Sequence, residues 1–253
     1  MTSPSYRPAP SVTQVPDAVR ARSAVESAQS VDVVWDGGSC AVVEGLAALA
    51  DGGLAWDVPD GTALHRRLAS SLRADDDLGV CVGVTDLAPL AVPGRVRGRL
   101  ALAGWLAVAP GGGASAGLRV RLDPVEVVWH GGAGPAVTLD EEEYRGSAPD
   151  PLAAWEADLL LAVDHDRPLA DRLERLALAG PGGGGGGTAR LLWLDRAGLV
   201  VRVLDGGRDG RAASPVRDVR LRLGHDATTV ELAWEGLEGL AQHVRRGPGL
   251  PPT

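Results

Sequence analysis

The sequence contains no lysine, isoleucine, asparagine or phenylalanine, so all 25 of its Lys/Arg residues are arginines. Without a lysine side chain the protein cannot form a Schiff base with a substrate carbonyl or with pyridoxal phosphate. This absence excludes pyridoxal phosphate chemistry of the Schiff-base kind from the functions that the chain can perform.

Cysteine is also scarce. The only two, Cys40 and Cys81, are each flanked by apolar residues in a predicted strand, a setting typical of a buried free thiol. A protein with few cysteines suits a reducing compartment. The two cysteines are far apart, and none of the five histidines has a partner at metal-ligand spacing. A structural zinc site is therefore not indicated.

Long apolar runs and blocks of positive charge are missing as well. No stretch approaches the ~18 apolar residues that a membrane span needs, and the first sixteen residues show neither an apolar core nor a cleavage pattern. The formal charge of −8 argues against non-specific binding of nucleic acid. We expect a soluble, cytoplasmic protein without a membrane or nucleic-acid partner.

The most regular stretch of the chain is the segment 95–108. Its even-numbered residues from 96 onward are apolar or glycine, whereas Arg95, Arg97 and Arg99 occupy odd positions. Strict alternation over this length predicts a long strand. The odd positions then change to alanine and Trp105, so we expect the strand to begin half exposed and to end buried on both faces. We interpret it as the central strand of a barrel.

The first half of the chain contains further strands separated by short turns. They are expected at 31–35, 39–46, 54–58, 79–84, 118–122 and 125–130, with helices from Pro16 and over 61–73. About six strands with two inserted helices within roughly 120 residues are typical of an antiparallel barrel or sandwich.

The second half has a different composition and order. A helix is expected to be capped by Asp150, and Pro168 either ends it or begins a second one. Strands at 189–194, 199–204 and 219–223 precede a final helix with Thr228 and Glu231 at capping-box spacing. The predicted fold class is α+β, with a tail at 1–15, a barrel domain at 16–147, an α-β-β-β-α domain at 148–246 and a tail at 247–253.

Three runs of the sequence resemble a known family. They are VTDLAPLAVPGRVRGRLALAGWL, LDPVEVVW and EYRGSAPDPLAAWEADLLLAVDHD. They are similar to actinobacterial members of the haem-utilisation group of split barrels related to pyridoxamine 5′-phosphate oxidase. The most specific parts are the strand from Arg99 to Gly104 and the pair Asp164-His165. The resemblance covers residues 16–246.

This resemblance implies a split barrel that forms a homodimer and holds haem, another tetrapyrrole or FMN at or near the subunit interface. Haem-degrading relatives use a histidine near the C-terminus as iron ligand, and no motif decides between His165, His225 and His243 here. The chain also departs from the family pattern: Ala162 replaces an asparagine, Pro168 follows His165 closely, and Leu223-Gly224-His225 replaces an aromatic-proline ending.

Arginines and one histidine are the candidate binding residues. Arg95, Arg97 and Arg99 recur at about 6.6 Å along one strand face and could clamp a flavin phosphate or haem propionates, or form an ordinary solvated face. Arg66, with Arg67 and Arg73, is a second anion-binding candidate or plain surface. His165 lies between two aspartates, so it is a candidate ligand or general base, or a helix-end cap.

Three other motifs have simpler interpretations. Residues 113–117, GASAG, match the nucleophile-elbow pattern, but a strand rather than a helix is predicted after them. The glycine run at 182–187 lacks the ending of a phosphate loop and is interpreted as a linker. The acidic run 140–143 is interpreted as a solvated boundary segment.

These observations leave three functional hypotheses. The first is a dimeric haem- or tetrapyrrole-binding protein with haem-degrading or other redox activity. The second is a non-catalytic binding or regulatory protein on the same scaffold. The third is an FMN-dependent oxidoreductase. No catalytic residue is assigned from the sequence.

Overall fold

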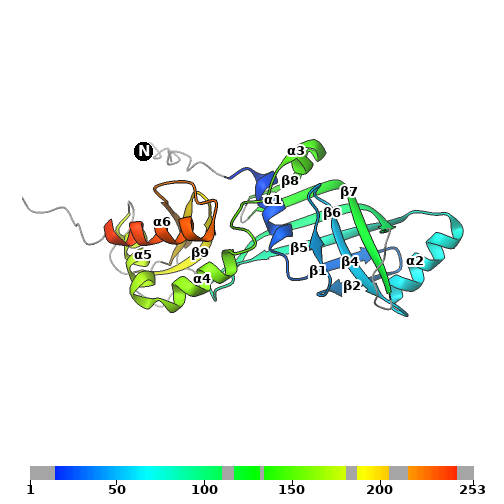
Figure 1. Cartoon of the computed structure of the whole chain (residues 1–253), viewed down its shortest axis with the longest axis horizontal. Helices are drawn as coiled ribbons and strands as arrows, with labels where there is room; N and C mark the ends of the chain where they lie inside the picture. Colours follow the sequence, from blue (N-terminus) through cyan, green and yellow to red (C-terminus); the bar gives the residue numbers. More distant parts are fainter. Residues whose placement is uncertain (1–14, 110–116, 132–133, 181–186, 205–215, 244–253) are drawn as a thin grey trace, which may run out of the picture.

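The computed structural model describes residues 15–109, 117–131, 134–180, 187–204 and 216–243. An eight-stranded antiparallel sheet curls around one core, and a separate three-stranded antiparallel sheet belongs to a smaller unit at the other end of the molecule (Figure 1). The predicted α+β class, a curled antiparallel sheet followed by a smaller helix-and-sheet unit, is confirmed.

The large unit contains three helices and eight strands. In chain order they are α1 (Asp17–Glu26), β1 (Val31–Trp35), β2 (Gly38–Val42), β3 (Ala47–Ala48), β4 (Leu54–Pro59), α2 (Ala63–Ala74), β5 (Leu78–Leu87), β6 (Val96–Val108), β7 (Gly117–Gly131), β8 (Ala136–Leu139) and α3 (Glu141–Gly146). The strand order is β2-β1-β5-β6-β7-β4-β3, with β8 paired to β7. The strands predicted at 118–122 and 125–130 are in fact one continuous strand, β7.

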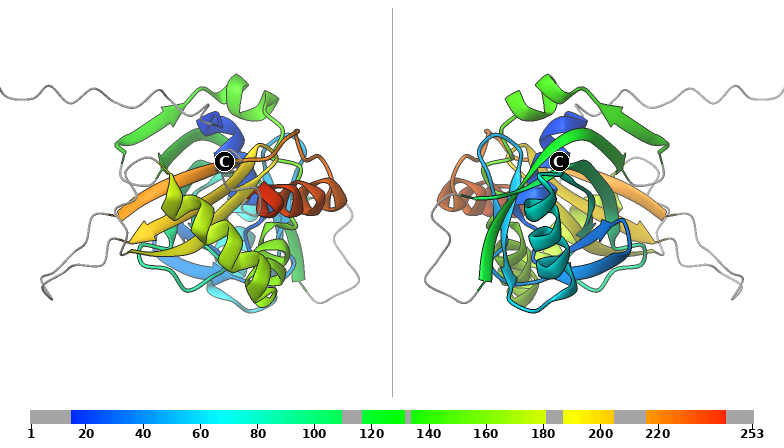
Figure 2. Two further views of the ribbon diagram at one scale, coloured as in Figure 1. Left: turned by 90° about the vertical axis from the view of Figure 1, so that its left-hand side faces the viewer. Right: turned by 90° about the vertical axis from the view of Figure 1, so that its right-hand side faces the viewer.

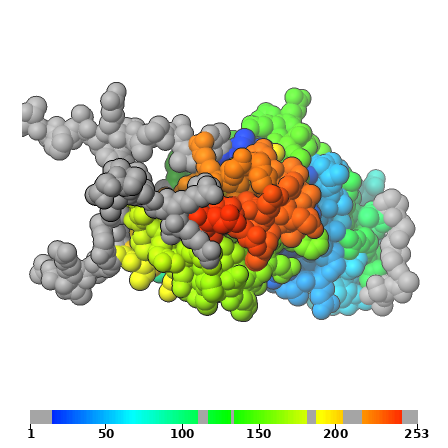
Figure 3. Space-filling model, turned by 60° about the vertical axis from the view of Figure 1, so that its left-hand side comes forward, coloured from blue at the N-terminus to red at the C-terminus, as the bar shows by residue number. Residues whose placement is uncertain are grey.

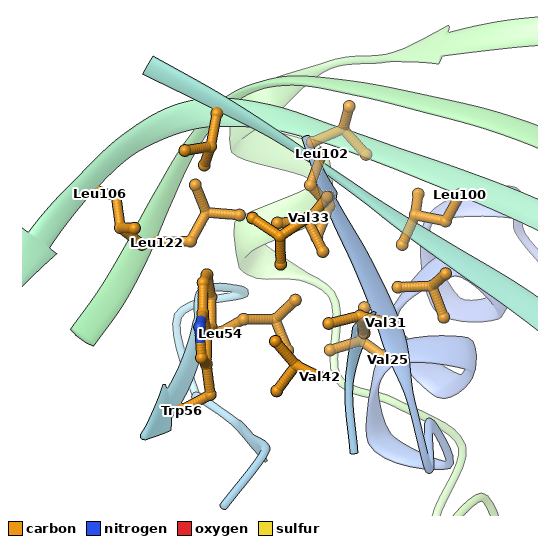
Figure 4. Close-up of a cluster of buried hydrophobic side chains, with 14 of the residues drawn as sticks. Val25, Val31, Val33, Val42, Leu54, Trp56, Leu100, Leu102, Leu106 and Leu122 are labelled. Atoms are coloured by element: carbon orange, nitrogen blue, oxygen red, sulfur yellow. The ribbon is translucent and has the colours of Figure 1, made fainter. Parts of the chain in front are cut away.

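Strand β6 occupies the middle of the sheet, between β5 and β7. Its even-numbered residues from Gly98 to Leu106 are buried, and Leu100, Leu102 and Leu106 point into the core (Figure 4). The prediction that the strand ends buried on both faces is wrong, because the side chain of Trp105 is 51% exposed. On the same face, Arg99 and Ala107 are exposed, and Ala101 and Ala103 are half-buried.

The core of the large unit is built from branched aliphatic residues of the strands, closed by the small residues of α1. Ala18, Ala21, Ala24 and Val25 of α1 are buried, which lets the helix pack closely on the sheet. Trp56 from β4 and Val42 from β2 point toward the same core (Figure 4). On α2 the predicted apolar stripe is partly wrong: Leu64 and Leu68 are buried, but Leu72 is 59% exposed.

Strand β7 continues through Asp123 and Pro124, because Gly104 of β6 has no side chain to collide with its backbone there. The pairing register shifts between Ala103 and Gly104, leaving Val125 as the extra residue opposite β6. A Cβ atom on Gly104 would stand 2.1 Å from the Asp123 carbonyl oxygen. Glycine at this position therefore permits the bulge that joins the two halves of the strand.

The small unit packs three helices against its sheet. They are α4 (Glu156–His165), α5 (Arg167–Ala179) and α6 (Val230–His243), with β9 (Thr188–Asp195), β10 (Gly198–Leu204) and β11 (Val216–Arg222) in the order β11-β10-β9. The helices and one face of the sheet share a core that includes Leu160, Leu173, Val201 and Leu237. Pro168 begins a second helix, which selects one of the two predicted alternatives.

Two local expectations after residue 148 are wrong. Asp150 does not cap α4, which begins at Glu156; its carboxylate accepts hydrogen bonds from the backbone N–H groups of Leu152 and Arg196 instead. The acidic run 140–143, in the large unit, is exposed as predicted, and Asp140 also caps α3. At α6 the hydroxyl of Thr229, rather than Thr228, accepts from the Leu232 N–H.

The two units touch through the second face of the small sheet. Ala88 and Val92 from the β5–β6 connection pack against Leu192 and Val200 of β9 and β10. The small unit forms one end of the molecule, whereas α2 faces the viewer at the other end (Figure 2, right). The space-filling view shows the two units in continuous contact, with α6 on the outer surface of the small unit (Figure 3).

Both cysteine predictions need correction. Cys40 is half-buried and Cys81 is exposed, because each lies on the outward side of its strand. None of the described helices is long and apolar enough to span a bilayer. The motif at 113–117 up to its last glycine, the glycine run at 182–186, the N-terminal tail up to residue 14 and the C-terminal tail lie outside the described residues.

Candidate functional site

A polar cleft lies at the junction of the two units and holds two of the predicted arginines. Its volume is about 450 Å³. The wall comes from α1 and the residues after it, the end of β5, the β5–β6 connection, β6 and the first two turns of α4. The charged residues in this wall are Asp86, Arg95, Arg97, Glu156 and Asp158. We call this space the junction cleft.

Arg97 is the central residue of an ionic network that joins the two units. Its Nε donates to Asp86 at 2.9 Å, and Nη2 donates to Asp86 and to Glu156. Nη1 donates to Glu156 and to the Leu192 carbonyl oxygen, which lies 3.4 Å away. The side chains of Arg97 and Glu156 are only 6% and 7% exposed. Burial lowers the pKa of Arg97, but the Glu156 and Asp86 carboxylates outweigh it and raise the pKa overall. The guanidinium therefore stays charged.

Glu156 extends the network into the small unit. Its Oε1 also accepts a hydrogen bond from the Leu194 backbone N–H at 3.0 Å. The first residue of α4 is thereby tied both to β6 of the large unit and to β9 of the small one. Since all five N–H donors of Arg97 face protein acceptors, Arg97 has none left for a ligand.

Arg95 differs from Arg97 in being exposed and unpaired. Its side chain forms no ion pair or hydrogen bond within the described residues, although it lines the junction cleft. Asp158, on the α4 wall, is an exposed carboxylate. The cleft thus has a free cation on the β6 side and a negative charge on the α4 side, so an acidic ligand group would be attracted to Arg95.

Behind the cleft, three arginines surround the ring of Trp193. The guanidinium carbons of Arg20, Arg97 and Arg220 lie 4.7, 5.9 and 5.6 Å from its centroid. Arg220 is paired with Asp195 at 2.7 and 2.8 Å. Burial lowers the pKa of Arg20, whose Asp17 partner is 3.8 Å away. Cation–π contacts therefore reinforce the junction beside the ionic network.

Arg99 lies on the same outward face of β6 as Ala101, Ala103 and Trp105. It is exposed, and its register partner on β7 is His130. Val34 and Cys81 continue this face across β1 and β5, and Val125 adds to it from β7. We call Val34, Cys81, Ala103, Trp105 and Val125 the apolar outer face. Its nearest residue on β6, Ala103, follows Arg99 by four residues, about 13 Å along the strand.

His165 is the last residue of α4 and lies one helical turn beyond Leu161, the last residue of this helix in the cleft wall. Asp158 and Leu161 line the cleft, and His165 follows them on the same helix face. Its Nδ1 lies 2.8 Å from the Leu161 carbonyl oxygen. A carbonyl oxygen only accepts, so Nδ1 carries a proton, and in the neutral ring Nε2 has a free lone pair. This arrangement is the usual one for a histidine that binds a metal.

The remaining predicted residues lie elsewhere. Arg66 is on α2 at the far end of the large unit, where it donates to the Gly61 carbonyl oxygen. His225 is exposed after β11, and its Nε2 contacts the Leu232 carbonyl oxygen at 3.2 Å. His243 ends α6, and its side chain is outside the described part of the structure. The structure therefore brings Arg95 and Arg97 into one cleft and leaves His165 at the other end of α4 from the Arg97–Glu156 pair. A binding role for each of the three stays a prediction.

Sequence reasoning missed the carboxylates of the junction cleft. Asp86 and Glu156 are separated from Arg97 by 11 and 59 residues, and no local pattern links them. Glu156 lies inside a predicted helix, and nothing in the sequence distinguishes it from the other polar residues of that helix. Only the burial of an arginine could have indicated that acidic partners must exist.

Comparison with known proteins supports the fold. No family model matches the chain, and no curated protein matches it in sequence. A haem-binding protein from Mycobacterium smegmatis has a similar structure, with a TM-score of 0.60 and 21% identity over 93% of this chain and 100% of that one. At this identity the likeness establishes the shared fold alone.

Two further solved structures match more weakly. A protein of unknown function from Agrobacterium tumefaciens has 15% identity over 90% of this chain and 98% of its own, with a TM-score of 0.35. An FAD- and haem-binding protein from Mycobacterium smegmatis has 19% identity over 51% and 77%, with a TM-score of 0.33. We base no argument on these two.

Proposed function

We propose that this protein binds haem in the junction cleft, with His165 as iron ligand and Arg95 as partner of a propionate. Two observations carry the proposal: an unpaired arginine in the cleft wall, and a histidine with a free Nε2 one helical turn beyond that wall. A cleft of about 450 Å³ also lies within the usual range for small-molecule sites. Support comes from the haem-binding protein that shares the fold.

The residues at the cleft fit the chemistry of haem. Histidine is the commonest proximal ligand of haem iron, and Nδ1 of His165 is already oriented by the Leu161 carbonyl. A carboxylate pairs well with a guanidinium that has no internal partner, which is the state of Arg95. Bound haem would supply a redox-active iron at this position. The proposal concerns binding, and it assigns no catalytic residue.

The second part of the proposal concerns assembly. The apolar outer face is expected to be covered by a second copy of the chain, as the family resemblance implies. Val34 and Trp105 are 50% and 51% exposed on one face of the sheet. Glu126 and Asp123 of β7 lie beside Ala103 and Trp105 on this face, and an exposed apolar patch with a polar rim marks an association site.

The ligand assignment is tested by titrating haemin into the purified protein and into three single variants. We expect His165→Ala to lose the Soret shift of the wild-type complex or to weaken binding at least tenfold. His225→Ala and His243→Ala are the matched controls and should retain the wild-type spectrum. Loss of the shift in either control with retention in His165→Ala would contradict the assignment.

Flavin binding is the competing outcome of the same experiment. FMN is titrated in parallel and followed by quenching of its fluorescence. We expect no saturable change at micromolar protein, because the cleft has one free guanidinium for a phosphate that usually takes several donors. Bound yellow flavin with no haemin binding would replace the haem proposal with the flavin hypothesis.

A further inference from the structure

A second pocket lies at the opposite end of the large unit from the junction cleft. Its volume is about 240 Å³. Its wall comes from residues 40–44 at and after the end of β2, residues 56–59 of β4 and residues 62–64 at the start of α2. We call this space the α2 pocket. It is separate from the proposed haem site, because α2 and the small unit lie at opposite ends of the molecule (Figure 1).

The wall of the α2 pocket is mostly apolar. Val42, Val58 and Leu64 supply its buried side chains. Val43 also lines the pocket and is 66% exposed, although valine is among the residues that are most often buried. A ligand with an apolar body would cover Val43 and the wall beside it, and removing this surface from water favours binding.

One of the two carboxylates in this wall has no partner. The Asp57 carboxylate is paired with Arg119 at 3.1 Å. Glu44 is exposed and forms no ion pair or hydrogen bond within the part of the chain that the structure describes. His65 follows the α2 residues of the wall, and its Nε2 lies 3.1 Å from the Asp60 carboxylate. None of the described residues that line the pocket is basic, so its wall carries one uncompensated negative charge.

We propose that the α2 pocket binds a small organic cation, a protonated amine on a single apolar ring, whose ammonium group pairs with Glu44. The size follows from the volume. An apolar protein cavity of roughly 150 Å³ holds benzene, and drug-sized ligands occupy roughly 300–1,000 Å³. A pocket of about 240 Å³ suits one ring with a short side chain. An acidic ligand is disfavoured, because Glu44 would repel it and no basic side chain of the wall would offset the repulsion.

The test compares two compounds of the same shape. Benzylamine is protonated at neutral pH, and benzyl alcohol carries a neutral hydroxyl group in place of the ammonium group. Each is titrated at low salt into the full-length ¹⁵N-labelled protein, and the backbone amide signals of residues 41–44 and 62–64 are followed. We expect both compounds to shift these signals. Benzylamine should bind about 2- to 5-fold more tightly than benzyl alcohol, the ratio expected for one exposed ion pair.

Two pairs of matched variants locate the binding. Glu44→Gln should abolish the preference for benzylamine, whereas Glu235→Gln, which neutralises an exposed glutamate on α6, should keep it. Ala63→Leu adds bulk to an exposed residue of the pocket wall, and Ala74→Leu adds the same bulk at the other end of α2. The affinity for both compounds should fall about fivefold or more in Ala63→Leu, the effect of overfilling a packed space, and stay unchanged in Ala74→Leu.

Four results would each overturn the proposal. They are unmoved amide signals at 41–44 and 62–64 with both compounds, equal affinity of the wild-type protein for the two, a preference for benzylamine that survives in Glu44→Gln, and equal affinity of the two leucine variants. Amide signals far from α2 that keep their wild-type positions verify that each variant is folded. None of these outcomes depends on whether the protein binds haem.

Discussion

Replacing Arg97 with methionine is expected to lower the free energy of unfolding by about 3–5 kcal/mol. The substitution would leave the buried carboxylate of Glu156 and the nearly buried one of Asp86 without their cation. It would also remove the link between β6 and α4. Urea denaturation, followed by tryptophan fluorescence, measures the effect as a shift of the midpoint.

Two further variants make this prediction specific. Arg167→Met removes an exposed arginine that pairs with Asp164 and Asp171, and it should change stability by less than about 0.5 kcal/mol. Adding Asp86→Asn and Glu156→Gln to Arg97→Met should recover much of the loss, because the buried charges disappear together. If the urea midpoint of Arg97→Met equalled that of Arg167→Met, the ionic network around Arg97 would not stabilise the contact between the two units.

Trp105→Glu is expected to convert a dimer into a monomer. At micromolar concentration the wild-type protein should have twice the 26.0 kDa mass of one chain. The variant puts a negative charge on the apolar outer face in place of an exposed indole. Loss of one aromatic anchor typically costs about 2–4 kcal/mol of association free energy, which raises the dissociation constant roughly 30- to 1,000-fold.

Light scattering coupled to size-exclusion chromatography measures this mass directly. Trp155→Glu is the matched control, since Trp155 is 55% exposed but lies at the start of α4, away from the outer face. It should leave the mass unchanged. A monomeric wild-type protein, or a Trp105→Glu variant that remains dimeric, would contradict the assignment of this face to the subunit interface.

The alternation of residues along β6 correctly predicted which face of the strand is buried in the core, but it did not predict that the opposite face is exposed. The even residues of β6 from Gly98 to Leu106 are buried, because side chains two residues apart lie on the same side of a strand. The odd residues are small or aromatic, and the sequence predicted that they too are buried. In the monomer they face outward, because apolar composition does not distinguish a covered core from a surface that is expected to meet a second copy.

The candidate site was partly predictable for a different reason. Arg95 and Arg97 are two residues apart, so a strand places them near each other, and His165 stood out by its acidic neighbours. What the sequence could not show is that the two arginines have different surroundings. Arg97 is buried by the contact between β5, β6, α4 and β9, and that contact depends on pairings between residues far apart in the chain.

Haem binding in the junction cleft is the central claim, and the most direct test is a haemin titration of the wild-type protein beside Leu161→Trp. Leu161 is 38% exposed in the cleft wall, and a tryptophan there would fill the cleft while keeping the carbonyl that orients His165. We expect low-micromolar affinity for the wild type, near −8 kcal/mol, and at least tenfold weaker binding for the variant. Equal haemin affinity of the two proteins, or no Soret shift in the wild type, would contradict the account.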